Sequence, residues 1–336
     1  MAGTDYKMWI GGEWCESASK KAIDSINPAT SEVIGSIPRG TEADAHKAIQ
    51  AARSAFDQGE WPRMSYQDRG DILRQIAQLI REKASDLARL ETLDNGKPIK
   101  ESTLIDIPTA ADTFERFAGM AGELKGETIP VTPPAMSYTR YGPIGVAAQI
   151  IPWNYPLLMA AWKLAPALIT GNTVVLKPST LTSLTALELA KLMEETDLPQ
   201  GVVNVVTGPG SEIGTALAAS QQVDKIALTG STETGRKVMG LAASNIKKIT
   251  LELGGKSPTI VLKDADLEVA LNGALATIFL NQGQMCVAGS RLLVQEDIHK
   301  EFIQRLVAKA EKIKLGNGLD PETTMGPLIS KEHRAK

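Results

Sequence analysis

The chain has 336 residues, of which 43% are hydrophobic and 22% charged, and its formal net charge is −3. This length allows two domains with a large core, and the charge gives no electrostatic reason to expect binding to nucleic acid or an anionic membrane. Two cysteines are too few for a disulfide framework or a cysteine-based zinc site. The three histidines are scattered and are predicted to lie on helix surfaces, so we expect no metal.

Nothing in the sequence indicates export or membrane insertion. Residues 1–6 lack the basic and apolar segments of a signal peptide, and the apolar stretch 157–168 is interrupted by Lys163 and Pro166. Because low cysteine content also suits a reducing compartment, we expect a cytoplasmic protein.

The first third of the chain is predicted to contain short strands followed by helices. Residues 9–38 combine short apolar runs with turn residues, which indicates strands and turns. Helical spacing of apolar residues follows over 43–56, 65–93 and 109–123, with 65–93 as one helix. Strand-like alternation over 137–141 comes after an irregular segment.

From residue 143 onward, short apolar runs alternate with helical segments. The predicted strands cover 145–151, 173–176, 202–206, 225–228, 248–251 and 259–262. The predicted helices cover 157–168, 181–195, 212–219 and 234–243. Continuous apolar strands separated by helices are typical of a parallel sheet with helices on both faces, so the predicted fold class is α/β.

Two segments carry residues suited to covalent chemistry. Cys286 ends the polar, turn-like run Asn281 to Cys286, whereas structural cysteines usually sit among apolar residues. Glu252 lies upstream in Leu251 to Lys256. Together they suggest a thiol nucleophile and a general base. From the residues alone, a packed and inert thiol remains the alternative.

Ligands of open parallel sheets bind beyond the carboxyl ends of the strands, so the turns there are candidate sites. The turn within 205–214 follows a strand but spaces its glycines one residue wider than G-x-G-x-x-G, so a plain tight turn stays open. The hydroxyl-rich turn 229–235 suits a phosphate at a helix N-terminus, or capping by Ser231 or Thr232.

Two further turns carry single polar residues of interest. Lys177 ends an apolar strand, where it can reach a ribose or phosphate or simply meet solvent. Asn154 lies between Pro152 and Pro156, which restrict the backbone. A rigidly held amide can donate to a developing oxyanion, and a purely structural turn is the alternative.

In chain order, the motifs PWNYP, GNTVVLKPS, TGSTETG, LELGGKSP and FLNQGQMC resemble the NAD(P)-dependent aldehyde dehydrogenase superfamily. The resemblance extends over nearly the whole chain. It implies a Rossmann-like cofactor domain at 1–122 and 143–254, an oligomerisation segment at 123–142, and the first part of an α/β catalytic domain at 255–336.

The resemblance also implies a mechanism of aldehyde oxidation to the carboxylic acid. Cys286 attacks the aldehyde, and Asn154 with the Cys286 main-chain N–H holds the thiohemiacetal oxyanion. Hydride transfer leaves a thioester, which water activated by Glu252 hydrolyses. A thiolate is both a strong nucleophile and a good leaving group, so it suits both steps.

A cofactor site and a substrate tunnel follow from the same resemblance. Lys177 matches a contact to the adenosine ribose, Ser231 a contact to the pyrophosphate, and Gly210 and Gly214 the adenine end. The other expected cofactor-site residues are Ile151, Trp153, Ser179, Thr180, Gly230 and Gly235. The expected tunnel residues are Tyr155, Met159, Trp162 and Met285.

Two departures from the family pattern and one match carry expectations. Thr180 stands where many NAD-preferring members have a glutamate that repels a 2′-phosphate, so NADP should be tolerated as well as NAD. Leu280 replaces a tryptophan of plant betaine aldehyde enzymes, which makes a trimethylammonium substrate less favoured. The presence of Glu252 favours water over coenzyme A as acyl acceptor.

The family continues well beyond Lys336, and its full-length members are expected to form homodimers or homotetramers. One alternative is therefore an inactive fragment that binds nucleotide or is only structural. A second is a cofactor-independent thioesterase or esterase that uses the same thiol.

Overall fold

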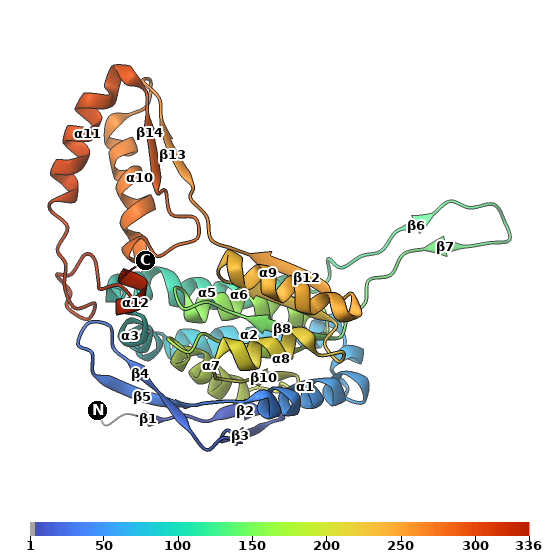
Figure 1. Cartoon of the computed structure of the whole chain (residues 1–336). Coiled ribbons are helices and arrows are strands. Elements are labelled where there is room, and N and C mark those ends of the chain that lie inside the picture. The colour runs from blue at the N-terminus through green and yellow to red at the C-terminus, as the bar shows by residue number, and fades with distance from the viewer. Residues whose placement is uncertain (1–3, 336) are drawn as a thin grey trace.

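The structure is a computed structural model that describes residues 4–335, and a seven-stranded sheet forms its centre (Figure 1). In spatial order the strands are β12 (Lys248–Glu252), β11 (Lys225–Thr229), β8 (Val146–Ile150), β9 (Thr173–Lys177), β10 (Val203–Val205), β2 (Met8–Ile10) and β3 (Glu13–Cys15). The first five run parallel, whereas β2 and β3 add antiparallel pairs at one edge.

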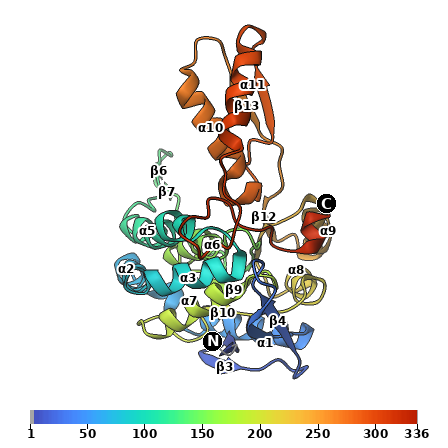
Figure 2. The ribbon, with the colours of Figure 1, turned by 90° about the vertical axis from the view of Figure 1, so that its left-hand side faces the viewer.

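Helices cover both faces of this sheet (Figures 1 and 2). One layer contains α2 (Tyr66–Glu82), α3 (Ala84–Asn95), α5 (Ile107–Gly119), α6 (Pro156–Ile169) and α7 (Leu184–Glu194). The other contains α1 (Glu42–Asp57), α8 (Thr215–Ala219) and α9 (Thr232–Ala242). Along β9, Val174 and Leu176 enter the apolar core on the first side and Val175 the core on the second. This alternation confirms the predicted α/β fold with a sheet covered on both faces.

The segment 65–93 was expected to be one helix, and this is wrong, because α2 and α3 are separate helices that meet at Lys83. The apolar stripe is interrupted here, since residues 81–83 and 85–86 are exposed between the buried Ile80 and Leu87. The expected helix over 109–123 forms earlier, as α5. Before it come α4 (Ile99–Glu101) and the π-helical turn η2 (Ser102–Asp106).

A smaller second unit rises beyond one edge of the sheet (Figure 2). It pairs β13 (Pro258–Val261) in parallel with β14 (Arg291–Val294) and packs them against α10 (Leu267–Phe279) and α11 (Glu296–Ala310). The predicted strand 259–262 therefore forms, but in its own sheet. Afterwards the chain returns to the first unit, where Ile99 N donates to Gly318 O at 2.8 Å, and α12 (Lys331–Arg334) follows.

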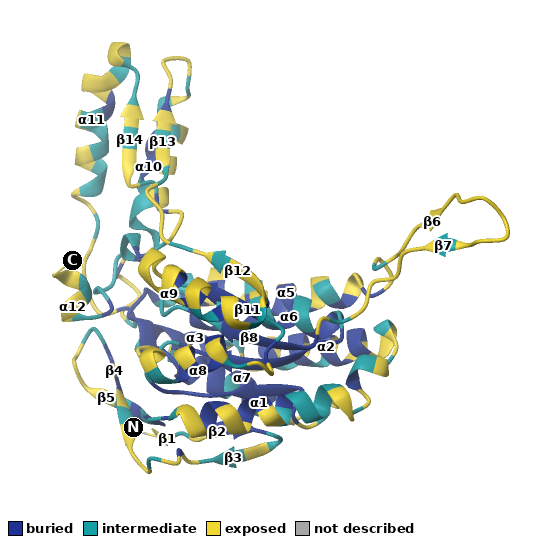
Figure 3. Cartoon of the chain, turned by 45° about the vertical axis from the view of Figure 1, so that its right-hand side comes forward, coloured by how far each residue is buried: buried dark blue, intermediate teal, exposed yellow. Residues whose placement is uncertain are grey.

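The segment 123–142 projects away from the body as a thin hairpin (Figures 1 and 3). Its strands are β6 (Thr128–Ile129) and β7 (Ser137–Tyr138), which pair antiparallel. Exposed apolar side chains along it include Met136 at 78% and Tyr138 at 65%. The remaining elements are β1 (Thr4–Asp5), β4 (Ala22–Ile26), β5 (Val33–Pro38), η1 (Trp61–Arg63), η3 (Gly210–Gly214), η4 (Ala243–Asn245) and η5 (Leu280–Gly283).

Charged side chains are buried in the layer that contains α3 and η2. Glu91, Asp94, Lys97 and Asp106 are all 0% exposed. Glu91 accepts hydrogen bonds from Thr185 Oγ1 at 2.6 Å and from the main-chain N of Leu157 at 3.3 Å. Burial raises the pKa of Glu91 to about 7 and that of Asp94 to about 7. With these raised carboxyl pKa values, the native state binds protons more tightly than the unfolded chain does. The protein therefore loses stability as pH rises through the native pKa values.

We predict that Glu91→Gln changes the pH dependence of unfolding. Since each pKa unit corresponds to about 1.4 kcal/mol, the melting point of the variant should rise relative to wild type by the equivalent of ~2 kcal/mol between pH 5 and pH 8. Thermal melts at several pH values measure this. Glu195→Gln, on an exposed carboxylate of the same layer, controls for loss of charge. An equal trend in both variants would contradict the prediction.

Candidate active site

The parallel register brings the predicted turns to one edge of the sheet. Ile150 at the end of β8 pairs with Lys177 at the end of β9 and with Leu228 of β11, and Thr229 pairs with Glu252 of β12. The turn of Asn154, the helix start at Ser231 and the segment after Glu252 therefore all leave the sheet on the same side. Ligands of open α/β sheets bind at this side.

A strained turn precedes Cys286. Helix α10 ends at Phe279, and Asn281, Gln282 and Gly283 then adopt φ values of +48°, +58° and +71°. Gly283 suits this conformation because it has no side chain, and a Cβ at this position would lie only 2.9 Å from Ile278 O. Asparagine tolerates this conformation, but for Gln282 it costs ~1 kcal/mol. The turn reverses the chain and leaves Cys286 exposed.

Hydrogen bonds connect the Cys286 loop to the Asn154 turn. Asn154 Nδ2 donates to Gln284 O at 2.8 Å, and Asn281 Nδ2 donates to Asn154 O at 3.0 Å. Asn281 is fully buried, and its main-chain N donates to Glu101 Oε2 at 2.9 Å. Because an amide nitrogen carries two hydrogens, the bond to Gln284 O uses only one of those on Asn154.

Cys286 and Glu252 line one cavity of ≈ 600 Å³. Met159 and Trp162 of α6, both expected tunnel residues, belong to the same lining. A Cβ added at Gly255 would lie 2.8 Å from Cys286 O, so the segment after β12 runs directly against the cysteine loop. The structure thus joins four of the predicted residues in one cavity.

Two other expected tunnel residues lie outside the lining of this cavity. Met285 is half-buried in the cysteine loop. The ring of Tyr155 is also half-buried and has Lys97 Nζ 3.9 Å from its centroid, and burial raises the pKa of its hydroxyl. Both side chains thus lie beside the Cys286 loop rather than in the lining of the ≈ 600 Å³ cavity.

Lys163 of α6 and Lys177 at the end of β9 have lowered pKa values. Burial lowers the pKa of Lys163 to about 8, an effect that Glu252 opposes, and Lys163 lines the Cys286 cavity. Burial also lowers the pKa of Lys177 to about 8, and its Nζ donates to Pro178 O at 2.8 Å. Both ammonium groups remain mostly protonated at neutral pH.

The residues expected to bind the cofactor occupy the turns at this edge. Ser231 Oγ accepts from Thr234 N at 3.1 Å and caps α9, as the structural alternative held. Ser179 Oγ accepts from Leu181 N at 3.2 Å. Ile151, Gly214 and Gly235 are buried, Gly210 is exposed, and Trp153, Thr180 and Gly230 are intermediate.

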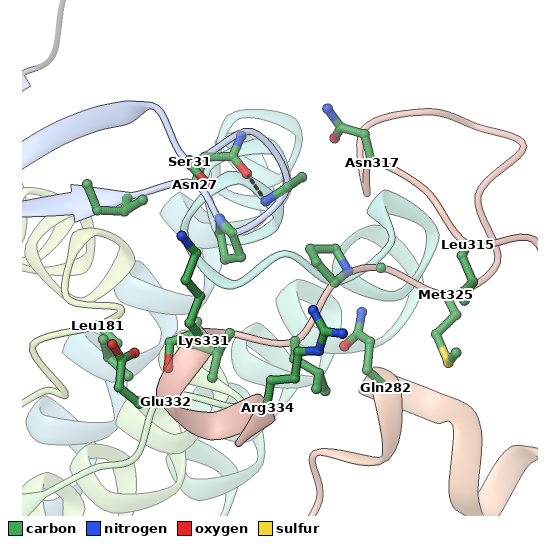
Figure 4. Close-up of a pocket in the computed structure, with 18 of the residues that line it drawn as sticks. Asn27, Ser31, Leu181, Gln282, Leu315, Asn317, Met325, Lys331, Glu332 and Arg334 are labelled. Atoms are coloured by element: carbon green, nitrogen blue, oxygen red, sulfur yellow. Dashed lines mark hydrogen bonds between the residues drawn. The ribbon is translucent and has the colours of Figure 1, made fainter. Parts of the chain in front are cut away.

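A second cavity of ≈ 1080 Å³ lies between Thr180, the turn around Asn27 and the C-terminal segment 315–334 (Figure 4). Lys331 and Arg334 of α12 belong to its lining. His333 of the same helix packs edge-on against Trp153, with ring centroids 4.7 Å apart. His333 thus lies on a helix and is half-buried, with its ring against Trp153.

The sequence analysis missed three residues that hold the two loops. Asn281 and Gln284 stand within the cysteine motif, so their polarity was the available signal. Lys97 follows a predicted helix end and carries no motif, and only the fold places it under Asn154.

Residues 4–335 contain neither a cluster of metal-ligating side chains nor a membrane-spanning helix. No group of three or more His, Cys, Asp or Glu side chains there is arranged to hold a metal ion. No helix in that part is long and apolar enough to cross a membrane.

The model of the aldehyde dehydrogenase family matches residues 14–336. Betaine aldehyde dehydrogenase of Bacillus subtilis is 51% identical over 98% of this chain and 67% of its own length. Human mitochondrial aldehyde dehydrogenase is 48% identical over 96% of this chain and 63% of its own.

A crystal structure of betaine aldehyde dehydrogenase from Staphylococcus aureus in complex with NAD+ superposes with a TM-score of 0.96 at 48% identity. The alignment covers 98% of this chain and 65% of that one. The chain thus spans about two thirds of the length of these relatives. Because it matches both the family model and these relatives, the chain belongs to the aldehyde dehydrogenase family.

Proposed function

We propose that this protein oxidises an aldehyde to the carboxylic acid with NAD or NADP. The observation that carries the proposal is the single cavity lined by Cys286 and Glu252, with the Asn154 turn tied to the cysteine loop. A nucleophile, a base and an amide donor are the groups that acyl transfer through a covalent intermediate needs.

The reaction starts when the Cys286 thiolate bonds to the aldehyde carbon. The second hydrogen of Asn154 Nδ2 and the Cys286 main-chain N–H hold the resulting oxyanion. NAD(P)+, when bound, would supply the acceptor for the hydride that leaves this carbon, and the product left on Cys286 is a thioester. Glu252 then takes a proton from water, the water oxygen bonds to the thioester carbon, and the C–S bond breaks to release the acid and the thiolate.

The residues at the strand ends fit a dinucleotide. Lys177 supplies a buried cation at the end of β9, and α9 begins beside Glu252, since Gly230 N donates to Glu252 O at 3.0 Å. Free N–H groups of a helix start suit a pyrophosphate. Ser231, Gly210, Gly214, Gly230 and Gly235 would hold the pyrophosphate and adenine side, and Ile151, Trp153, Ser179 and Thr180 the ribose side.

Which aldehyde the protein oxidises can be tested directly. Similarity to two betaine aldehyde dehydrogenases suggests a trimethylammonium substrate. Against it, Lys163 and Lys225 line the cavity and would repel a cation, and Leu280 offers no aromatic face. Comparing betaine aldehyde with neutral aldehydes of similar size separates the two.

The second candidate is a nucleotide-binding fragment without turnover. The chain spans about two thirds of the length of the relatives named above. Cofactor binding without aldehyde oxidation by the 336-residue chain would favour it.

We predict that Cys286→Ala abolishes both cofactor reduction and ester hydrolysis, because both need the thiolate. Glu252→Gln should retain a first burst of reduced cofactor but slow steady turnover by about 10²–10⁴-fold, the usual effect of losing a general base. Stopped-flow absorbance of the reduced cofactor measures both phases.

Cys15→Ala is the matched control, since Cys15 is the other free thiol and lies at the far edge of the sheet in β3. Loss of activity in this variant, or full activity in Cys286→Ala, would refute the assignment of the nucleophile.

We predict that both cofactors are accepted, with kcat/KM values within about a thousandfold of each other, or ~4 kcal/mol. Thr180→Glu should disfavour NADP by at least roughly tenfold, because a carboxylate beside the ribose repels a 2′-phosphate. Thr180→Gln matches its size without the charge. Calorimetric binding of NAD and NADP supplies the same comparison without turnover, and equal effects of both substitutions would argue against repulsion.

We also propose the division into a cofactor domain (1–122 and 143–254), an oligomerisation segment (123–142) and the start of a catalytic domain (255–336), in a homodimer or homotetramer. The projecting hairpin, with Ile129 43% and Tyr138 65% exposed, supports an intersubunit role.

The double variant Ile129→Lys with Tyr138→Lys should therefore shift the protein towards the monomer, as measured by size-exclusion chromatography with light scattering. Leu104→Lys, at a 75% exposed apolar side chain of η2, is the control. An unchanged mass in the hairpin variant would count against this role.

A further inference from the structure

A buried lysine that the proposed reaction does not use lies beneath the Asn154 turn. Lys97 is fully buried just after α3. Its Nζ donates to Asp106, which is equally buried, and to Asn154 O at 2.9 Å. Burying an ammonium is costly unless partners satisfy it, so its partners indicate what it holds in place.

Two contacts of Lys97 are to the turn that carries Asn154. Besides Asn154 O, its ammonium faces the ring of Tyr155, 3.9 Å from the centroid. Asn154 O also accepts from Asn281 Nδ2 at 3.0 Å. This one carbonyl oxygen therefore joins the α3–α5 layer, the turn after β8 and the loop of Cys286.

The same contacts continue towards the nucleophile. Asn281 Nδ2 donates to Gln284 O at 3.3 Å as well, and the Asn154 side chain donates to that oxygen at 2.8 Å. Asn281 and Gln282 have positive φ. Residues in such strained conformations persist only where their surroundings hold them, and the bonds around Asn154 O are part of what holds this turn.

We propose that Lys97 is a positioning residue, which fixes the Asn154 amide and the Cys286 loop relative to each other through the Asn154 carbonyl. The importance of Lys97 for catalysis rests on the proposed function. Its effect on the position of the two loops is independent of that function. The competing explanation is that Lys97 only neutralises Asp106 inside the fold.

The two explanations differ in a double variant. Lys97→Met leaves Asp106 buried without its cation, which destabilises the protein for reasons unrelated to the active site. Lys97→Met with Asp106→Asn removes that charge as well, so the melting point should return towards wild type. A positioning role predicts that the loops remain loosened although stability recovers.

Lys247→Met is the matched control. Lys247 is 7% exposed, and its Nζ donates to the main-chain oxygens of Ala218 and Ser220 at 2.6 and 2.7 Å. It directly precedes β12, at the end of that strand opposite Glu252. This substitution removes an equivalent lysine without touching the Asn154 turn.

Amide hydrogen exchange by mass spectrometry provides a readout that needs no turnover. In the double variant, peptides covering 153–155 and 281–286 should exchange at least about threefold faster, whereas β9 keeps its wild-type rate. In Lys247→Met these two segments should be unchanged. With an aldehyde and cofactor, kcat of the double variant should fall by about 10²-fold with KM within about threefold, as expected for a misplaced catalytic group.

Wild-type exchange in both segments of the double variant would overturn the proposal, and so would faster exchange spread over the whole chain. If wild type shows no turnover, the proposed function fails, and the exchange experiment still decides the role of Lys97. If Lys97→Met does not fold, the double variant alone gives the answer.

Discussion

The candidate site depends on one constraint, the parallel register of β8, β9, β11 and β12. Because parallel strands all end at the same edge, residues distant in sequence emerge together there. Glu252 is fixed in this way by its pairing with Thr229, and the Asn154 turn by the end of β8 beside Lys177. The helix layers on both faces hold the strands in this register, and the rest of the site is built on the edge that they create.

Cys286 reaches this edge by a different route. Its loop does not belong to the main sheet but follows α10 of the second unit, so hydrogen bonds rather than strand pairing must hold it in place. Asn281, Gln284 and Asn154 provide them, and the left-handed residues before Cys286 show that the local backbone is held against its own preference. Cys286 is thus positioned by polar contacts across two units, and Glu252 by the sheet.

Much of the fold followed from local patterns. The apolar runs at 145–151, 173–176 and 225–228 are strands, because continuous apolar segments of this length suit a sheet buried on both faces. The break at Lys83 was missed, since helical spacing continues on both sides of it. β14 was also missed, because its exposed and half-buried residues depend on a partner strand 33 residues away, as Pro258 pairs with Arg291.

The candidate site could be predicted from the sequence only where a residue lies within a motif, as Cys286 and Glu252 do. The contact of Lys97 with Asn154 was not, because 57 residues separate them and neither local sequence refers to the other.

The close approach at Gly255 limits which residues this position can accept. A side chain at Gly255 would meet the Cys286 carbonyl oxygen at 2.8 Å, and Gly255 lies three positions after Glu252 in the chain. Any replacement must therefore push the nucleophile loop away from the segment that carries the base. The contact therefore restricts replacement of Gly255 although this glycine is exposed in a loop, where substitutions are usually tolerated.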